Sequence, residues 1–262
     1  MTTEKSGRAA AIIWHHWQRL TRIDELPADC RPSDRAQGYA AQAEVVRMSG
    51  QKVVGWKIAA TSLAGQKHIG VDGPLAGPLL SSRVLDSGAT VSLDGNIMKV
   101  AEAEFCFRFR ASLPARGSPY DLSEVLDAVE SLHPAIEVPD SRYNDFARVG
   151  APQLIADTAC ACWFVLGRAT NENWRARDLV SHPAAAHKNG LPAGTGSGAN
   201  VLGDPRIALA WIANELRMFG DGLRAGDIVT TGTCVAPVPI APGDSVRADF
   251  GVFGDVTVNV DA

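Results

Sequence analysis

The sequence lacks both an excess of positive charge and a long hydrophobic run. Its 262 residues include 25 lysines and arginines against 29 aspartates and glutamates, a formal net charge of −4. This balance gives no electrostatic reason to expect binding to nucleic acid. No apolar stretch approaches the roughly 18 residues of a membrane span, and the polar start at Met1–Lys5 is unlike a secretory signal. We therefore expect a cytoplasmic protein without nucleic-acid or membrane partners.

Paired cysteines and clustered histidines are also missing. The five cysteines form no C-x-x-C pair, and none of the six histidines has metal-ligand spacing with a partner. The chain therefore offers neither a disulfide framework nor a typical zinc motif, and we expect the thiols to be reduced. The composition, 46% hydrophobic and 21% charged, suits one large domain or one domain with a small addition.

The residues 100–109, Val-Ala-Glu-Ala-Glu-Phe-Cys-Phe-Arg-Phe, alternate as a β-strand does. Glu102 and Glu104 then share one face, and the alanines and phenylalanines form the opposite, apolar face. Two carboxylates so close repel each other unless a cation lies between them or both are hydrated. The pattern thus fits either a metal site or the wet face of an edge strand.

A third glutamate and one lysine have similarly ambiguous settings. Glu137 lies within the apolar run 133–138, where a lone carboxylate would be costly. Three carboxylates without histidine or cysteine partners make an all-oxygen donor set, which suits Mg²⁺ or Mn²⁺ better than Zn²⁺. Lys57 ends the β-prone stretch 51–58; it is either a functional cation or an ordinary lysine whose stem covers apolar surface.

Helical patterns dominate the N-terminal part of the chain. Apolar residues at helical spacing predict helices over residues 7–22 and 33–48. The glycine- and proline-rich passage 70–80 reads as loop and turn leading into a short strand. We place a domain boundary there, which divides the chain into an N-terminal helical cap region (1–70) and a second, larger domain (71–262).

The rest of the chain mixes two predicted helices with many short strands. A capping-box pattern at Asp121–Glu124 predicts a helix to about Leu132, and Asp204-Pro205 opens another to about Phe219. Two Gly-Asp turns, at 226–227 and 243–244, each precede a short strand, which favours antiparallel β structure over a Rossmann sheet. The glycine-rich passage 194–200 lacks the G-x-x-x-x-G-K-[ST] form of a phosphate-binding loop.

Taken together and in this order, six motifs resemble one enzyme group, the 2-keto-4-pentenoate hydratases and 2-oxo-3-hexenedioate decarboxylases of the fumarylacetoacetate hydrolase superfamily. The resemblance covers roughly residue 40 to the C-terminus. The motifs are Gly-Trp-Lys-Ile (55–58), Glu-Ala-Glu (102–104), Ala-Ile-Glu-Val-Pro-Asp-Ser-Arg (135–142), Gly-Ser-Gly-Ala-Asn-Val-Leu-Gly-Asp-Pro (196–205), Ala-Gly-Asp-Ile-Val-Thr-Thr-Gly-Thr (225–233) and Pro-Gly-Asp-Ser-Val-Arg-Ala-Asp-Phe (242–250).

The resemblance implies an α+β fold, a mixed β-sandwich roll with an N-terminal helical cap. It also implies a Mg²⁺ or Mn²⁺ ion held by three carboxylates, which correspond here to Glu102, Glu104 and Glu137. Lys57 would be the catalytic lysine, which orients a 2-oxo acid substrate or moves protons if burial lowers its pKa. The implied substrate-binding residues are Leu79, Arg83, Cys160 and Thr233.

The sequence departs from the family pattern in two places. Relatives commonly carry Ala-Asp-Asn-Ala-Ser where this chain has Ala-Asp-Thr-Ala-Cys at 156–160, so Thr158 and Cys160 change a segment near the substrate. Arg83 follows a segment, 72–80, that closes over the site in relatives, and it stands where they often carry acidic residues. It would favour a substrate with a second carboxylate, or it is a surface arginine.

The implied activity is the hydration of a 2-hydroxy-2,4-dienoate to a 4-hydroxy-2-oxo acid in the degradation of aromatic compounds. The alternative is decarboxylation of 2-oxo-3-hexenedioate (4-oxalocrotonate), which uses the same metal motif. Hydrolysis of a C–C bond would need a base, for which His68 is the candidate, and a non-catalytic relative would have lost the carboxylates. We also expect a homo-oligomer, because the N-terminal helices are rich in tryptophan and isoleucine.

Overall fold

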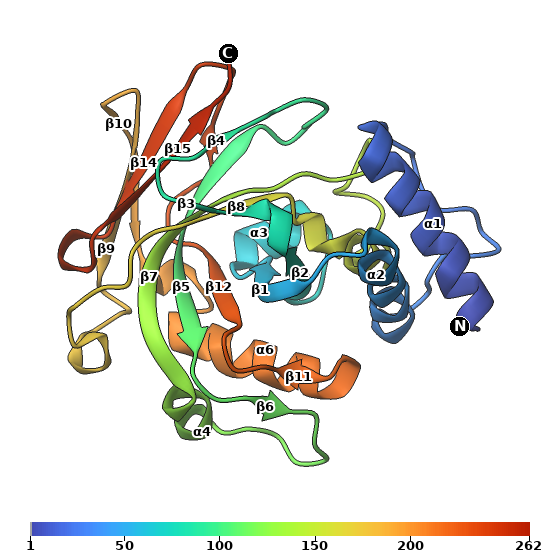
Figure 1. The fold of residues 1–262 in the computed structure, drawn as a ribbon, viewed down its shortest axis with the longest axis horizontal. Coiled ribbons are helices and arrows are strands. Elements are labelled where there is room, and N and C mark those ends of the chain that lie inside the picture. The colour runs from blue at the N-terminus through green and yellow to red at the C-terminus, as the bar shows by residue number, and fades with distance from the viewer. Residues whose placement is uncertain (1) are drawn as a thin grey trace.

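The computed structural model describes residues 2–262 and contains three β-sheets with helices around them (Figure 1). The α-helices are α1 (Thr3–Arg19), α2 (Arg35–Ser49), α3 (Leu63–His68), α4 (Leu122–Asp127), α5 (Ala151–Ala156) and α6 (Pro205–Phe219). The strands are β1 (Val53–Ala59), β2 (Leu75–Leu80), β3 (Val84–Asp86), β4 (Thr90–Val91), β5 (Val100–Phe109), β6 (Leu113–Pro114), β7 (Val129–Val138), β8 (Trp163–Leu166), β9 (Pro183–Lys188), β10 (Leu191–Ser197), β11 (Gly222–Leu223), β12 (Ile228–Thr233), β13 (Val238–Pro239), β14 (Ser245–Asp249) and β15 (Asp255–Val260).

The largest sheet has eight strands in the order β2-β1-β12-β5-β7-β8-β3, with β13 pairing beside β5. It is mixed, because β1 runs parallel to β12 and β3 parallel to β8, whereas β5 is antiparallel to both β12 and β7. Mixed sheets with few helices confirm the α+β class. Strand β1 belongs to this sheet although it precedes residue 70, and the division of the chain at residue 70 stays a prediction.

A second sheet, β10-β9-β14-β15-β4, covers the apolar face of β5. The predicted alternation in β5 is confirmed, since Phe105, Phe107 and Phe109 are fully buried. The ring centroid of Phe105 lies 4.9 Å from that of Phe250, just after β14. Tight packing of these rings fixes the register of β5, and Glu102 and Glu104 must therefore point to the other face.

Helices flank the sheets on two sides. In Figure 1, α1 and α2 lie side by side, and α2 also packs against α5. Helix α6 buries one face, including Ala208, Leu209 and Ile212, in the main core. None of the helices in residues 2–262 is long and apolar enough to cross a membrane.

Two local predictions differ from the structure. The helix expected from Asp121 to about Leu132 ends at Asp127, and residues from Val129 onward form β7. Pairing of β7 with β5 and β8 in the sheet outweighs local helix propensity there. In the passage 72–80, where a loop and a short strand were expected, β2 covers Leu75–Leu80. Its pairing with β1 and the burial of all its residues stabilise this longer strand.

Candidate active site

Three glutamates meet where β5 lies beside β7. Glu102 stands directly opposite Glu137 in the register, and Glu104 follows two residues along the same face. One oxygen from each carboxylate lies within 4.8 Å of the others. Strand β5 lies inside the sheet, and Glu104 and Glu137 are only 1% exposed, so the edge-strand alternative is wrong.

Several oxygens of this cluster accept no hydrogen bond. Glu104 Oε2 accepts from the Gly232 amide (3.0 Å) and from the Thr230 hydroxyl. Glu104 Oε1 and Glu137 Oε2 are buried and accept no hydrogen bond from the described residues, and Glu137 Oε1 has only the Lys57 ammonium beside it, at 3.0 Å. Because an unsatisfied buried carboxylate is costly, the orphaned oxygens fit a bound hard cation, for which an all-oxygen donor set is suited.

Burial disfavours the charged forms of all three carboxyls, and repulsion by neighbouring carboxylates adds to this at Glu102 and Glu104. Burial, reinforced by the charge of Glu137, raises the pKa of Glu102 to about 7 although Lys57 opposes the shift. The pKa values of Glu104 and Glu137 are also raised, again chiefly by burial. A divalent cation among them would reverse this preference by favouring the charged forms.

Lys57 reaches the cluster from β1, and its side chain is 3% exposed. Its Nζ lies 3.0 Å from Glu137 Oε1 and donates to the Ala159 carbonyl at 2.9 Å. Burial would lower the pKa of Lys57, but the charges of Glu137 and Glu102 raise it above its ordinary value. Lys57 is therefore held as a cation in this fold, and since an ammonium has three donors, one remains for a ligand.

Glu102, Glu104 and Lys57 line a cavity of about 620 Å³, within the size range of small-molecule sites. Cys160 and Thr233 also line this cavity. Burial raises the pKa of the Cys160 thiol to about 12, so it stays protonated. The Thr233 hydroxyl donates to the Val235 carbonyl at 2.5 Å. Glu137 lies behind the cavity wall, paired with Lys57.

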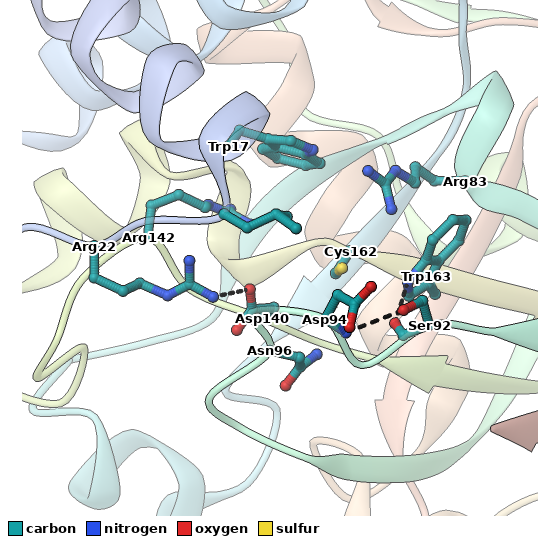
Figure 2. A pocket seen from close by; sticks show the side chains of 11 residues that line it. Trp17, Arg22, Arg83, Ser92, Asp94, Asn96, Asp140, Arg142, Cys162 and Trp163 are labelled. Atoms are coloured by element: carbon teal, nitrogen blue, oxygen red, sulfur yellow. Dashed lines mark hydrogen bonds and ion pairs between the residues drawn. The ribbon is translucent and has the colours of Figure 1, made fainter. Parts of the chain in front are cut away.

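Two predicted substrate-binding residues do not line this cavity. Leu79 is 3% exposed and packs with Cys106 and Phe164 in a separate apolar cluster. Arg83 lines a different cavity of about 200 Å³, which we call the arginine cavity (Figure 2). There the guanidinium carbon of Arg83 lies 4.0 Å from the ring centroid of Trp163. The structure thus separates these two side chains from the cavity that Lys57 lines.

The residue pattern did not identify the two residues, Thr230 and Gly232, that orient the Glu104 carboxylate by hydrogen bonds. Thr230 and Gly232 belong to the Thr-Thr-Gly-Thr motif at 230–233, which carried the family resemblance but no assigned role. Gly232 has φ of +96°, and a Cβ there would lie 2.0 Å from Thr61 Oγ1. Only glycine fits this position, which lets the backbone amide reach the carboxylate.

The chain belongs to a known family: residues 81–261 match the model of the fumarylacetoacetate (FAA) hydrolase C-terminal family. A 2-hydroxyhexa-2,4-dienoate hydratase of Comamonas testosteroni is 36% identical over 214 residues, 81% of this chain and 79% of that protein. A 4-oxalocrotonate decarboxylase of Pseudomonas sp. (strain CF600) is 35% identical over 218 residues, 82% of this chain and 81% of that protein.

A solved structure is similar over almost the whole chain. The 4-oxalocrotonate decarboxylase from Pseudomonas putida G7, complexed with magnesium and adipate, has a TM-score of 0.89 and 30% identity, covering 99% of this chain and 98% of that one. These relatives confirm the predicted resemblance. Identities of 36% to a hydratase and 35% to a decarboxylase do not separate the two activities. The two substrates differ in a second carboxylate, so the charge of the residues that line the cavity bears on the choice.

Proposed function

We propose that this protein is a metal-dependent hydratase that adds water to a 2-hydroxy-2,4-dienoate and forms a 4-hydroxy-2-oxo acid. One observation carries the proposal. The cavity combines the carboxylate cluster and Lys57 with walls that hold no other lysine or arginine among the described residues. Such a site suits a substrate with one anionic end and an uncharged chain.

Glu102, Glu104 and Glu137 would hold the metal, Mg²⁺ or Mn²⁺, and Glu104 is already oriented by Thr230 and Gly232. When bound, the metal supplies a Lewis acid for negative charge that develops on the substrate's oxygen atoms.

Lys57 would bind the anionic end of the substrate. Its Nζ is fixed by the Ala159 carbonyl and Glu137, so its remaining N–H is directed by the fold rather than by free rotation. As a cation, it donates a hydrogen bond to the carboxylate or the 2-oxygen and holds a proton beside the reacting carbon chain. This donation persists across neutral pH because the pKa of Lys57 is raised.

The far part of the cavity favours an uncharged substrate tail. Its wall is largely apolar, with His68 and Asn200 among the polar exceptions, and the apolar side chains include Ile69, Met98, Val100, Phe146 and Val235. A second carboxylate there would lose its hydration without gaining a fixed cation. This favours the hydratase over the decarboxylation of 2-oxo-3-hexenedioate.

The decarboxylase stays the second candidate, because a relative of that name matches this chain almost as well as the hydratase does. Hydrolysis of a C–C bond is less well supported. His68 lines the cavity but forms no hydrogen bond or ion pair with a described residue, and its ring neighbour is Phe146 at 6.1 Å. A general base needs an orienting partner, which His68 lacks within residues 2–262.

The test is an absorbance assay of purified protein with Mg²⁺ or Mn²⁺. 2-Hydroxypenta-2,4-dienoate, 2-hydroxyhexa-2,4-dienoate and 2-oxo-3-hexenedioate are offered separately. Loss of the dienol signal with formation of the 4-hydroxy-2-oxo acid, abolished by EDTA, is the expected result. Release of CO₂ from the diacid without action on either dienol would replace the hydratase with the decarboxylase.

Five further expectations, on the fold, the cap, the domain division, the location and the assembly, belong to the same proposal. The two sheets would form the β-sandwich roll of the family, and α1 and α2 would form its cap, within the division into residues 1–70 and 71–262. The protein would act in the cytoplasm as a homo-oligomer, which gel filtration with light scattering can measure. Their support is the family membership and the packing of α1 on α2.

A further inference from the structure

Residues 158–160 form a turn with an unusual backbone. Thr158, Ala159 and Cys160 have φ values of +54°, +51° and +63°. Left-handed conformation is unfavourable for residues with a Cβ, most of all for a β-branched residue such as Thr158. Three in succession persist only where the surroundings impose the conformation.

Arg142 supplies much of what holds this turn. Its Nη2 donates to the Asp157 carbonyl at 2.6 Å and to Thr158 Oγ1 at 3.1 Å, and its Nη1 donates to the Ala161 carbonyl at 3.3 Å. Its Nε also pairs with the Asp157 carboxylate. One guanidinium therefore bonds on both sides of the left-handed residues, which a flexible ammonium cannot reproduce.

The turn connects the Arg142 guanidinium to Lys57 and to the wall of the 620 Å³ cavity. The Ala159 carbonyl accepts from Lys57 Nζ at 2.9 Å, and Cys160 lines the large cavity. If the turn relaxed toward ordinary φ values, the Ala159 carbonyl would leave Lys57 and Cys160 would move in the wall.

We propose that Arg142 is a positioning residue for catalysis, which holds the 158–160 turn and through it the Lys57 ammonium. The role rests on the proposed function, since it presumes that Lys57 binds the substrate. Arg142 makes no hydrogen bond to Glu102, Glu104 or Glu137. Loss of its guanidinium would therefore impair turnover and spare metal binding.

The arginine cavity contains a matched control. Arg22 also lines it (Figure 2), is likewise buried, and pairs with Asp140 at 2.6 Å. Its other hydrogen bonds go to the carbonyls of Thr21 and Gly95, and none goes to residues 157–161. Arg22→Lys thus disturbs an ion pair of the same cavity without removing a side-chain bond to the turn, which Arg22 reaches only through Asp140, whose amide donates to the Cys160 carbonyl at 2.9 Å.

The experiment compares Arg142→Lys with Arg22→Lys in kcat, KM, Mg²⁺ affinity by calorimetry, and Tm. We expect Arg142→Lys to lower kcat by about 10- to 100-fold, because small misplacements of a catalytic group have effects of that size. Its Mg²⁺ affinity should stay within about twofold of the wild type, and Arg22→Lys should keep kcat within about threefold, because the Arg22 side chain makes no bond to the turn. Equal losses of kcat in both variants, or an unchanged kcat in Arg142→Lys, would overturn the proposal.

Because Arg142 borders the arginine cavity, a small cation can reach its place. Methylguanidinium added to Arg142→Ala should therefore restore part of kcat, and it should leave Lys57→Met inactive. If Arg142→Ala does not fold, the Lys variant still decides the question. A crystal structure of Arg142→Lys in which residues 158–160 keep positive φ and the Ala159 carbonyl still binds Lys57 would overturn the role of Arg142, whatever the wild type's activity. Failure of the wild type to hydrate any of the dienoates would contradict the proposed function alone.

Discussion

Two buried ionic clusters lie on either side of the turn at 158–160. The first holds Glu102, Glu104 and Glu137 with one lysine, and its buried oxygens Glu104 Oε1 and Glu137 Oε2 accept no hydrogen bond from the described residues. The second is the pair of Arg142 and Asp157. There Asp157 accepts from the Ser141 hydroxyl at 2.8 Å and the Arg142 amide at 2.9 Å besides the guanidinium.

The difference in hydrogen bonding distinguishes a ligand site from a structural element at equal burial. Native proteins satisfy nearly all buried polar atoms, so a group of orphaned acceptors indicates a missing partner. The Arg142–Asp157 pair needs no such partner, because protein donors and acceptors surround both charges. Removing charge should therefore have opposite consequences in the two clusters.

The largest expected effect is on metal binding. Glu104→Gln and Glu137→Gln should each weaken Mg²⁺ binding on the order of 100-fold or more, since replacing even groups behind a ligand costs 10- to 100-fold. Metal-free stability should hold or rise in Glu104→Gln, because a carboxylate repelled by its neighbours is removed. It should fall in Glu137→Gln, because the buried Lys57 ammonium loses its carboxylate partner at 3.0 Å. Calorimetry and thermal melts measure both quantities. Glu130→Gln, on the exposed part of β7, should change neither; a clear loss of metal-free Tm in Glu104→Gln would contradict the comparison.

The second cluster should show the reverse pattern. Asp157→Asn leaves the Arg142 charge buried without its carboxylate, and breaking such a pair typically costs about 3–5 kcal/mol of folding free energy. Mg²⁺ affinity should remain near that of the wild type. Urea unfolding gives the free energy, and calorimetry gives the affinity. A loss below about 1 kcal/mol would show that this pair contributes no more than a surface ion pair does.

A pH series sharpens the comparison. The pKa values of Glu102, Glu104 and Glu137 are raised in the metal-free fold, with Glu102 at about 7. Stability linked to these carboxyls is therefore present below their ordinary pKa and lost as pH rises through the folded values. Bound metal removes this loss, so the rise in Tm produced by Mg²⁺ should grow from about pH 5 to about pH 8. A Mg²⁺ effect that is constant or shrinks over this range would contradict the carboxylate assignment.

The smallest effect is expected at Arg83. Arg83→Met removes a cation–π contact with Trp163, worth about 0.5–1 kcal/mol at an exposed site. Because Arg83 lines the arginine cavity and not the cavity of Lys57, kcat/KM should change less than about twofold with either a mono- or a dicarboxylic substrate. A selective loss with the diacid would restore its predicted role in substrate recognition.

Much of the site was readable from residue spacing. Alternation placed Glu102 and Glu104 on one face of β5, and the apolar setting of Glu137 marked it as needing a partner. The helix 205–219 was also predicted correctly, because Pro205 starts it and a clear apolar stripe continues through it. These features depend on neighbours in the chain, which any reader of the sequence can see.

Other features depend on contacts between distant segments. The predicted helix to Leu132 gave way to β7, because pairing with β5 satisfies that backbone. The family resemblance implied that Leu79 and Arg83 bind the substrate, yet the course of the chain after β2 takes Arg83 to another cavity.

The sequence by itself determined the donor types: three carboxylates, one lysine and an apolar strand face, because side-chain chemistry and strand periodicity are local properties. Only the tertiary structure decided that Glu102 stands opposite Glu137, that Lys57 remains charged, and that Arg142 holds the turn beneath it. These depend on strand register and burial, and both arise when segments about 15 to 100 residues apart pack together and exclude water.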